Sequence, residues 1–118
     1  MAGVQQRGRR GPPVVARGEV WFVTLDPTVG SEAQKTRPCL IISPPEMHDY
    51  LRTVIVAPMT TKCKPAPYRI AVTFQGKRGL ILLDQVRTLD KVRLIRRLGS
   101  VSPGTLTSTL KTLQHVFA

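Results

Sequence analysis

Short runs of β-branched and other apolar residues, each ended by glycine, proline or polar residues, recur along most of the chain. Runs of this length and composition predict β-strands. They cover residues 19–25, 38–43, 53–58, 68–74, 79–84 and 97–101. The run 38–43 is continuously apolar, as expected of a strand buried on both faces, whereas 68–74 alternates like a half-exposed strand. So many short strands predict a mainly β protein whose sheet closes into a small barrel, because closure removes exposed edges.

The residues after the last predicted strand change to a helical pattern. Ser102 suits the N-cap, and Pro103 takes the first helical position, where its missing N–H costs nothing. Four apolar side chains then form one stripe at helical spacing. They are Leu106, Leu110, Leu113 and Phe117. We therefore expect a C-terminal α-helix that lies against the barrel or a partner subunit.

The first 16 residues differ in composition from the rest of the chain. Residues 1–16 are rich in glycine, arginine, proline and glutamine, which predicts a mobile basic arm, and residues 17–118 suffice for a single domain. Within that domain, residues 46–51 predict a short helical turn and residues 76–79 a hairpin turn.

The chain is strongly basic, with 18 lysines and arginines against 7 acidic residues and a formal charge of +11. Such a charge favours a polyanionic partner: a nucleic acid, an acidic membrane face or an acidic protein. No apolar run reaches the roughly 18 residues of a membrane span, and no hydrophobic stretch follows the N-terminal arginines. We expect a cytoplasmic protein that does not associate with membranes.

Cysteine and histidine residues are too few and too scattered to predict a zinc site. Cys39 and Cys63 form no CxxC pair, and the chain has only His48 and His115 besides them. No metal or other cofactor is expected. Cys39 lies inside an apolar run, which favours a small core residue over a nucleophile.

Three polar segments lie where strands of the predicted barrel begin or end. A loop over residues 26–36 ends at Arg37, just before a buried strand, so that Arg37 suits a phosphate fork held by a rigid element. Thr60, Thr61 and Lys62 leave another strand with two hydroxyl groups and a cation. Taken alone, these features also fit an arginine that caps a strand and a polar turn.

The third segment begins with Asp84, which follows four apolar residues and continues through Gln85 to Arg87. Asp84 could serve as a base or as an orienting carboxylate. Taken alone, it equally fits an ion pair with a nearby arginine such as Arg87.

Four motifs in this order resemble the MazF/PemK toxin family over roughly 100 residues, from Arg17 to the C-terminal helix. They are Leu25-Asp26-Pro27-Thr28 with Gly30-Ser31-Glu32, then Thr36-Arg37-Pro38, then Pro58-Met59-Thr60-Thr61, and finally the run from Leu82 to Asp90. The resemblance implies an SH3-like β-barrel with a C-terminal α-helix. It also implies an endoribonuclease that cleaves single-stranded RNA without a metal, leaving a 2′,3′-cyclic phosphate or 3′-phosphate and a 5′-hydroxyl.

The resemblance also implies site residues and partners. Arg37 and Thr60 match the catalytic pair, and Glu32, Asp84 and Gln85 match residues near the RNA. The expected RNA-binding or supporting set is completed by Ser31, Thr61, Lys62 and Arg87. The implied partners are a second copy of the chain and a MazE-like antitoxin with an acidic C-terminal segment. The toxin–antitoxin complex is further expected to bind its own promoter DNA.

The chain lacks two residues that are typical of one branch of the family. A plasmid branch has an arginine two residues before the matching aspartate, and these two residues serve as acid and base. That position is Leu82 here, and the branch's loop histidine is Ser31. The mechanism therefore resembles the chromosomal branch, centred on Arg37 and Thr60. Arginine is a poor base at neutral pH because it keeps its proton, so Arg37 is assigned mainly to charge stabilisation in the transition state.

Two other functions fit the same charge and fold. One is a barrel that binds RNA without cutting it, and the other is a toxin of similar fold that inhibits DNA gyrase. Neither requires the Arg37 and Thr60 pair. An RNA cleavage assay tests the first alternative, and a gyrase supercoiling assay tests the second.

Overall fold

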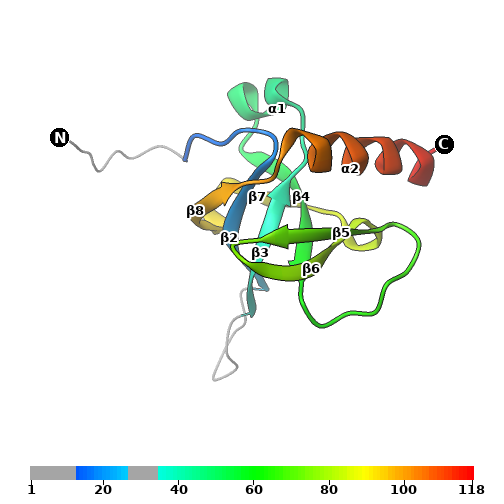
Figure 1. Cartoon of the computed structure of the whole chain (residues 1–118). Coiled ribbons are helices and arrows are strands. Elements are labelled where there is room, and N and C mark those ends of the chain that lie inside the picture. Colours follow the sequence, from blue (N-terminus) through cyan, green and yellow to red (C-terminus); the bar gives the residue numbers. More distant parts are fainter. Residues whose placement is uncertain (1–12, 27–34) are drawn as a thin grey trace.

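A computed structural model describes residues 13–26 and 35–118 and shows a strongly curled sheet with one long helix laid across it (Figure 1). The strands are β2 (Glu19–Asp26), β3 (Lys35–Ile41), β4 (Thr53–Thr60), β5 (Arg69–Phe74), β6 (Lys77–Leu82), β7 (Arg87–Asp90) and β8 (Leu94–Ser100). The helices are α1 (Pro45–Tyr50) and α2 (Pro103–Val116), with 3₁₀ turns η1 (Leu83–Gln85) and η2 (Lys91–Arg93). The prediction of a mainly β, barrel-like fold with a C-terminal helix is confirmed.

All the strand pairs are antiparallel, in the order β5-β6-β4-β3-β2-β8, and β7 also pairs with β4. Strand β4 is therefore the branch point of the sheet. Its beginning pairs with β7, and its last residues turn to β6 through the pairs Met59↔Ile81 and Thr60↔Leu80. Thr60 thus stands where the β5–β6 hairpin joins the rest of the sheet.

The core lies on both faces of β3. Leu40 belongs to a cluster with Val20 and Ile81, whereas the adjacent Ile41 belongs to a second cluster with Trp21 and Val54. Both Leu40 and Ile41 are fully buried. The prediction of a strand buried on both faces is confirmed here, and this double burial fixes the position of β3 firmly.

The two ends of the sheet path, β5 and β8, are linked by side chains. Gln75, at the tip of the β5–β6 hairpin, donates from Nε2 to the backbone oxygen of Leu98 on β8 at 3.0 Å. Beside it, a Cβ atom at Gly99 would lie 3.2 Å from the ring of Phe74, so glycine allows this close approach. The sheet therefore curls into a half-open barrel, in which contacts of this kind connect β8 to the β5–β6 hairpin.

The predicted boundaries of the β5–β6 turn and of the strand before Asp84 were wrong. The hairpin turn consists of Gln75 and Gly76, both with positive φ, and not of residues 76–79. Two residues with positive φ form the tight loop that matches the twist of paired strands. Lys77 and Arg78 consequently lie in β6. Asp84, predicted at the end of a strand, lies in η1.

Helix α2 begins as predicted. Ser102 accepts a hydrogen bond at Oγ from the backbone N–H of Thr105 at 3.1 Å, and Pro103 opens the helix. The apolar stripe is only partly confirmed, because Phe117 is 76 % exposed. Among the described helix residues, Thr109 is the one that is buried, and its hydroxyl donates to the Thr105 carbonyl oxygen at 2.8 Å. This bond satisfies the hydroxyl, so a threonine can face the sheet.

No helix within residues 13–26 and 35–118 is long and apolar enough to cross a membrane.

A polar cluster holds α1 against the sheet. Ser43 is 1 % exposed, and its Oγ lies 2.7 Å from Nε2 of His48 and accepts from the N–H of Ile55 at 3.2 Å. The buried Lys91 donates to the backbone oxygen of His48. Burial lowers the pKa of His48 from its ordinary 6.5, and the positive charge of Lys91 lowers the pKa further, while Asp49 opposes this effect and Arg17 adds to it.

This cluster predicts that the fold loses stability in mild acid. A histidine with a lowered pKa takes up its proton more readily in the unfolded chain, so the free energy of unfolding should fall as pH drops below about 6.5. Urea unfolding at pH 7.5 and 5.5 measures this change. The His48→Gln variant should show a smaller drop over the same interval. An equal drop in both proteins would contradict the role of His48, because the lowered pKa values of Glu19 and Asp84 place their titration below this range.

Candidate active site

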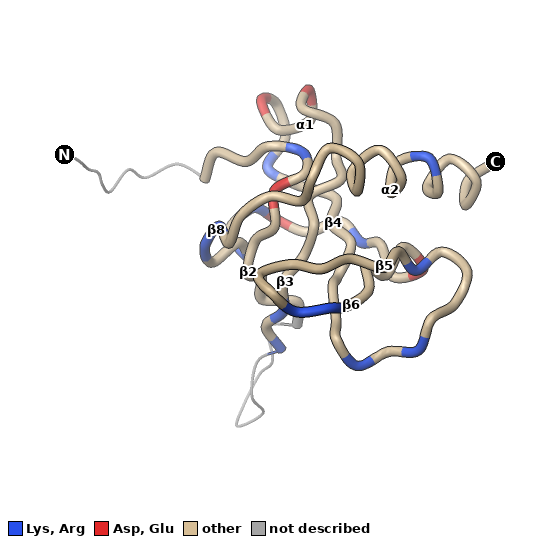
Figure 2. The backbone as a smooth tube through the Cα atoms, in the orientation of Figure 1, with Lys and Arg blue, Asp and Glu red and all other residues tan. Residues whose placement is uncertain are grey.

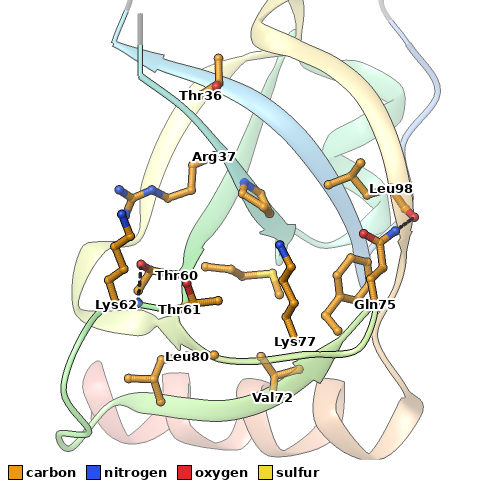
Figure 3. Close-up of a pocket in the computed structure, with 14 residues that line it drawn as sticks. Thr36, Arg37, Thr60, Thr61, Lys62, Val72, Gln75, Lys77, Leu80 and Leu98 are labelled. Atoms are coloured by element: carbon orange, nitrogen blue, oxygen red, sulfur yellow. Dashed lines mark hydrogen bonds between the residues drawn. The ribbon is translucent and has the colours of Figure 1, made fainter.

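An open pocket of about 400 Å³ lies between the start of β3, the end of β4 and the β5–β6 hairpin (Figure 3). Its lining brings together four of the residues predicted from the sequence, one from β3 and three from the end of β4 and the loop after it. They are Arg37, Thr60, Thr61 and Lys62. The curl of the sheet produces this meeting, because it folds the β5–β6 hairpin back toward β3.

Cationic side chains gather at the pocket from three segments. In Figure 3, Arg37 of β3 and Lys62 of the loop after β4 extend toward one another at one end, and Lys77 rises from β6 near the middle. Arg37 precedes the buried part of β3 and is paired in register with Val23 of β2, so its backbone is well held. A guanidinium held in this way can offer a planar fork to a phosphate group.

Thr60 has a hydroxyl group that is already oriented by the backbone. Its Oγ1 accepts a hydrogen bond from the N–H of Lys62 at 3.2 Å. Since the oxygen acts as the acceptor in this bond, the hydroxyl proton is left to donate to a ligand in the pocket. The turn thereby places a hydroxyl donor and the cation of Lys62 together.

Gly79 allows β6 to come very close to Thr60. A Cβ atom at position 79 would lie 2.6 Å from the backbone oxygen of Thr60 and 3.5 Å from the side chain of Thr61. The first distance is too short for any side chain, so even alanine would displace the backbone that carries Thr60. The position of Thr60 therefore depends on glycine at this point of β6.

Asp84 takes part in an ion pair outside the pocket lining. Its carboxylate accepts from Nε and Nη2 of Arg69 at 3.2 and 3.0 Å, and Nη1 of Arg69 also donates to the Lys64 carbonyl oxygen at 3.2 Å. An ion pair was one of the two expectations for Asp84, but Arg87 was the wrong partner. The hydrogen bond from Arg69 lowers the pKa of Asp84 below its usual 3.8, which makes this carboxylate a weak base.

Two further predicted site residues that the structure describes do not line this pocket. Gln85 and Arg87 are exposed, lie on η1 and β7, and do not line it. Ser31 and Glu32 fall outside the described residues. Their expected contribution to RNA binding stays a prediction.

Sequence reasoning missed Gln75 and Lys77, which line the pocket opposite Thr36 and Arg37. Because a turn was predicted over residues 76–79, Lys77 was not expected to lie in a strand. The signal that could have placed it is the two-residue interval at Gln75 and Gly76, which separates two runs that both fit strands. Gln-Gly is a weaker hairpin signal than Asn-Gly, so this signal is faint in the sequence.

Cys39 belongs to the hydrophobic core. Cys39 is fully buried, and burial raises the pKa of its thiol to about 12 although Arg37 and Arg87 oppose this rise. The prediction that Cys39 is a core residue is confirmed. Within the described parts of the chain, no three histidine, cysteine or acidic residues come together as metal ligands would.

Several basic residues lie around the pocket. Figure 2 shows basic segments in β6, in the loop after β4 and at the start of β3, on the side of the fold away from the acidic residues of α1. Three close cations and a hydroxyl donor can bind and polarise an extended anion such as a phosphodiester chain.

Comparisons with known proteins identify the family to which this chain is similar. Residues 16–117 match the family described as PemK-like, MazF-like toxins of type II toxin–antitoxin systems. The chain is 36% identical over 106 residues to endoribonuclease PemK of Escherichia coli, covering 85% of this chain and 80% of that protein. It is 39% identical over 87 residues to endoribonuclease EndoA of Bacillus subtilis (strain 168), covering 69% of this chain and 75% of that protein.

Solved structures share the fold at lower sequence identity. MazF from Deinococcus radiodurans aligns with a TM-score of 0.74 at 23% identity, covering 89% of this chain and 97% of that one. A mycobacterial endoribonuclease, solved in complex with its cognate antitoxin, aligns with a TM-score of 0.72 at 24% identity, covering 86% of this chain and 92% of that one. The match along nearly the whole chain shows that this protein belongs to the PemK-like, MazF-like family of toxins of type II toxin–antitoxin systems.

Proposed function

We propose that this protein is a toxin endoribonuclease that cleaves single-stranded RNA in the cytoplasm through the RNA's own 2′-hydroxyl. The observation that carries the proposal is the convergence of Arg37, Lys62 and the oriented Thr60 hydroxyl at one end of a basic pocket. The family relatives named endoribonucleases support the same activity.

The proposed reaction transfers the phosphate within the RNA. The 2′-oxygen loses its proton and forms a bond to phosphorus, while the bond from phosphorus to the 5′-oxygen breaks and that oxygen gains a proton. The products are a 2′,3′-cyclic phosphate and a 5′-hydroxyl. Arg37 stabilises the negative charge that develops on the phosphate oxygens, and Thr60 donates a hydrogen bond to one of them.

The test is cleavage of a synthetic single-stranded RNA, followed by analysis of both new ends. Cleavage should be blocked by a 2′-deoxy substitution at the cleaved nucleotide. It should be unchanged by EDTA, because the RNA supplies the nucleophile and the side chains supply the positive charge. A requirement for added magnesium, or a product ending in a 3′-hydroxyl, would contradict this reaction.

We also infer that a MazE-like antitoxin blocks the pocket with its acidic C-terminal segment, and that the toxin acts as a homodimer. The same cations that attract phosphates attract a carboxylate-rich peptide. A relative has been solved with its cognate antitoxin, and the chain exposes large apolar side chains, among them Tyr50, Val92 and Phe117.

Competition between RNA and antitoxin peptide tests the blocking mechanism. A fluorescent RNA with deoxy substitution should be displaced by the acidic peptide, and the peptide's affinity should fall as salt rises. Binding of both ligands at once, with no mutual change in affinity, would show that inhibition does not use this pocket.

A further inference from the structure

The pocket has two chemically different ends. Arg37 and Lys62 occupy one end, whereas the other is floored by apolar side chains (Figure 3). Val72 and Leu98 lie toward this end beside Gln75 (Figure 3), and Phe74 also lines the pocket. Arg37 and Lys62 can hold a phosphate at the cationic end, and a volume of about 400 Å³ leaves room for a larger group beside it, beyond Lys77 near the middle.

Gln75 stands at the rim of the apolar end in an unusual backbone conformation. Its φ of 51° lies in the left-handed region, which glycine and asparagine adopt more readily than glutamine. Residues held in this region are enriched at functional sites. The presence of glutamine at this position is explained by the hydrogen bond that its side chain makes.

The amide group of Gln75 is oriented by its bond to Leu98. The Leu98 backbone oxygen can only accept, so the atom that faces it at 3.0 Å must be the amide nitrogen of Gln75. The amide oxygen, Oε1, consequently points to the pocket side, as Figure 3 shows. A fixed hydrogen-bond acceptor thus stands above an apolar floor.

An acceptor above an apolar surface is suited to a nucleobase. The ring packs on the floor, and a donor on its edge satisfies the acceptor. Adenine, cytosine and guanine offer an exocyclic amine, whereas uracil surrounds its ring N–H with two carbonyl oxygens that repel another oxygen. Loss of such a bond leaves the acceptor without a partner, so the wrong base is penalised.

We propose that the apolar end of the pocket receives the base adjacent to the cleaved phosphate, and that Gln75 selects an amino-bearing base through Oε1. Gln75 is then a specificity-determining residue that touches the substrate. This inference rests on the proposed endoribonuclease function and extends it to the choice of RNA sequence.

The test compares cleavage of a randomised single-stranded RNA pool by the wild type, Gln75→Met and Gln114→Met. Methionine resembles glutamine in length but cannot accept or donate at the amide position. The exposed Gln114 on α2 does not line the pocket, so its variant should keep the wild-type preference. In Gln75→Met, the preference for an amino-bearing base should fall on the order of 3- to 10-fold at one position beside the cleaved bond.

A second measurement separates recognition from a structural role of Gln75. An RNA whose preferred base lacks its exocyclic amine should be cleaved more slowly by the wild type but not by Gln75→Met, because both changes remove the same bond. If methionine disturbs folding, Gln75→Asn takes its place in the test. Asparagine suits the turn but is shorter than glutamine, so it should lower the base preference as expected for Gln75→Met.

Three results would overturn the inference. They are an equal loss of rate on all sequences in Gln75→Met, an unchanged preference, and a wild-type preference for uracil at the affected position. Any of these, with cleavage intact in the wild type, would leave the endoribonuclease function standing. Absence of RNA cleavage by the wild type would overturn the function and this inference with it.

Discussion

Replacing Arg37 by alanine is expected to reduce RNA cleavage on the order of 10²- to 10³-fold while the protein stays folded. The guanidinium belongs to the cationic end of the pocket, where the phosphate gains negative charge during the reaction. The reduction should appear mainly in kcat, because the interaction strengthens as charge develops. Single-turnover cleavage and the thermal unfolding midpoint measure the two quantities.

Two further variants define what the loss means. Arg52→Ala removes the same unit of charge at an exposed position that does not line the pocket, and it should keep nearly full activity. Arg37→Lys keeps the charge but not the planar fork, and it should fall between the wild type and alanine. If purified Arg37→Ala keeps more than about a tenth of wild-type activity, Arg37 is not the cation on which the reaction depends.

Replacing Thr60 by alanine or valine should reduce cleavage on the order of 10²-fold, whereas Thr60→Ser should stay within about tenfold of the wild type. The hydroxyl group distinguishes these variants, since valine preserves the shape of threonine without it. The hydroxyl accepts from the N–H of Lys62, so its loss also weakens the turn that holds Lys62. Loss of the donor lowers kcat, and displacement of Lys62 raises KM.

The matched control for this series is Thr107→Ala, because Thr107 is exposed on α2 and does not line the pocket. Equal losses in Thr60→Ser and Thr60→Ala would point to packing and argue against a hydroxyl that works on the substrate.

The sequence predicted the fold well where burial is strong. The continuous apolar run over residues 38–43, with Leu40 and Ile41 buried, and the Ser102 cap of α2 both appear where their patterns indicated. Errors occurred where polar residues extend a strand beyond its apolar part. Lys77 and Arg78 lie in β6 because they pair with Phe74 and Thr73. The side chains of Lys77 and Arg78 are both exposed, so the sequence carries no apolar signal for this part of the strand.

The site was predictable in its parts but not in its boundary. Arg37, Thr60 and Lys62 carried local signals and meet in the pocket. Gln75 enters through a contact with β8 that joins residues 23 positions apart, and strand patterns do not encode such contacts. The partner of Asp84 was misjudged for a similar reason, because Arg69 reaches it from β5.

The short ladder between β4 and β6 has a consequence for motion. Two residue pairs join these strands, whereas six join β2 and β3. The β5–β6 hairpin should therefore be among the first units to open, with amide hydrogens that exchange faster than those of β3. One wall of the pocket thus fluctuates against the other. An RNA that touches both walls would slow this exchange, so the hairpin amides would report the arrival of substrate before any bond is broken.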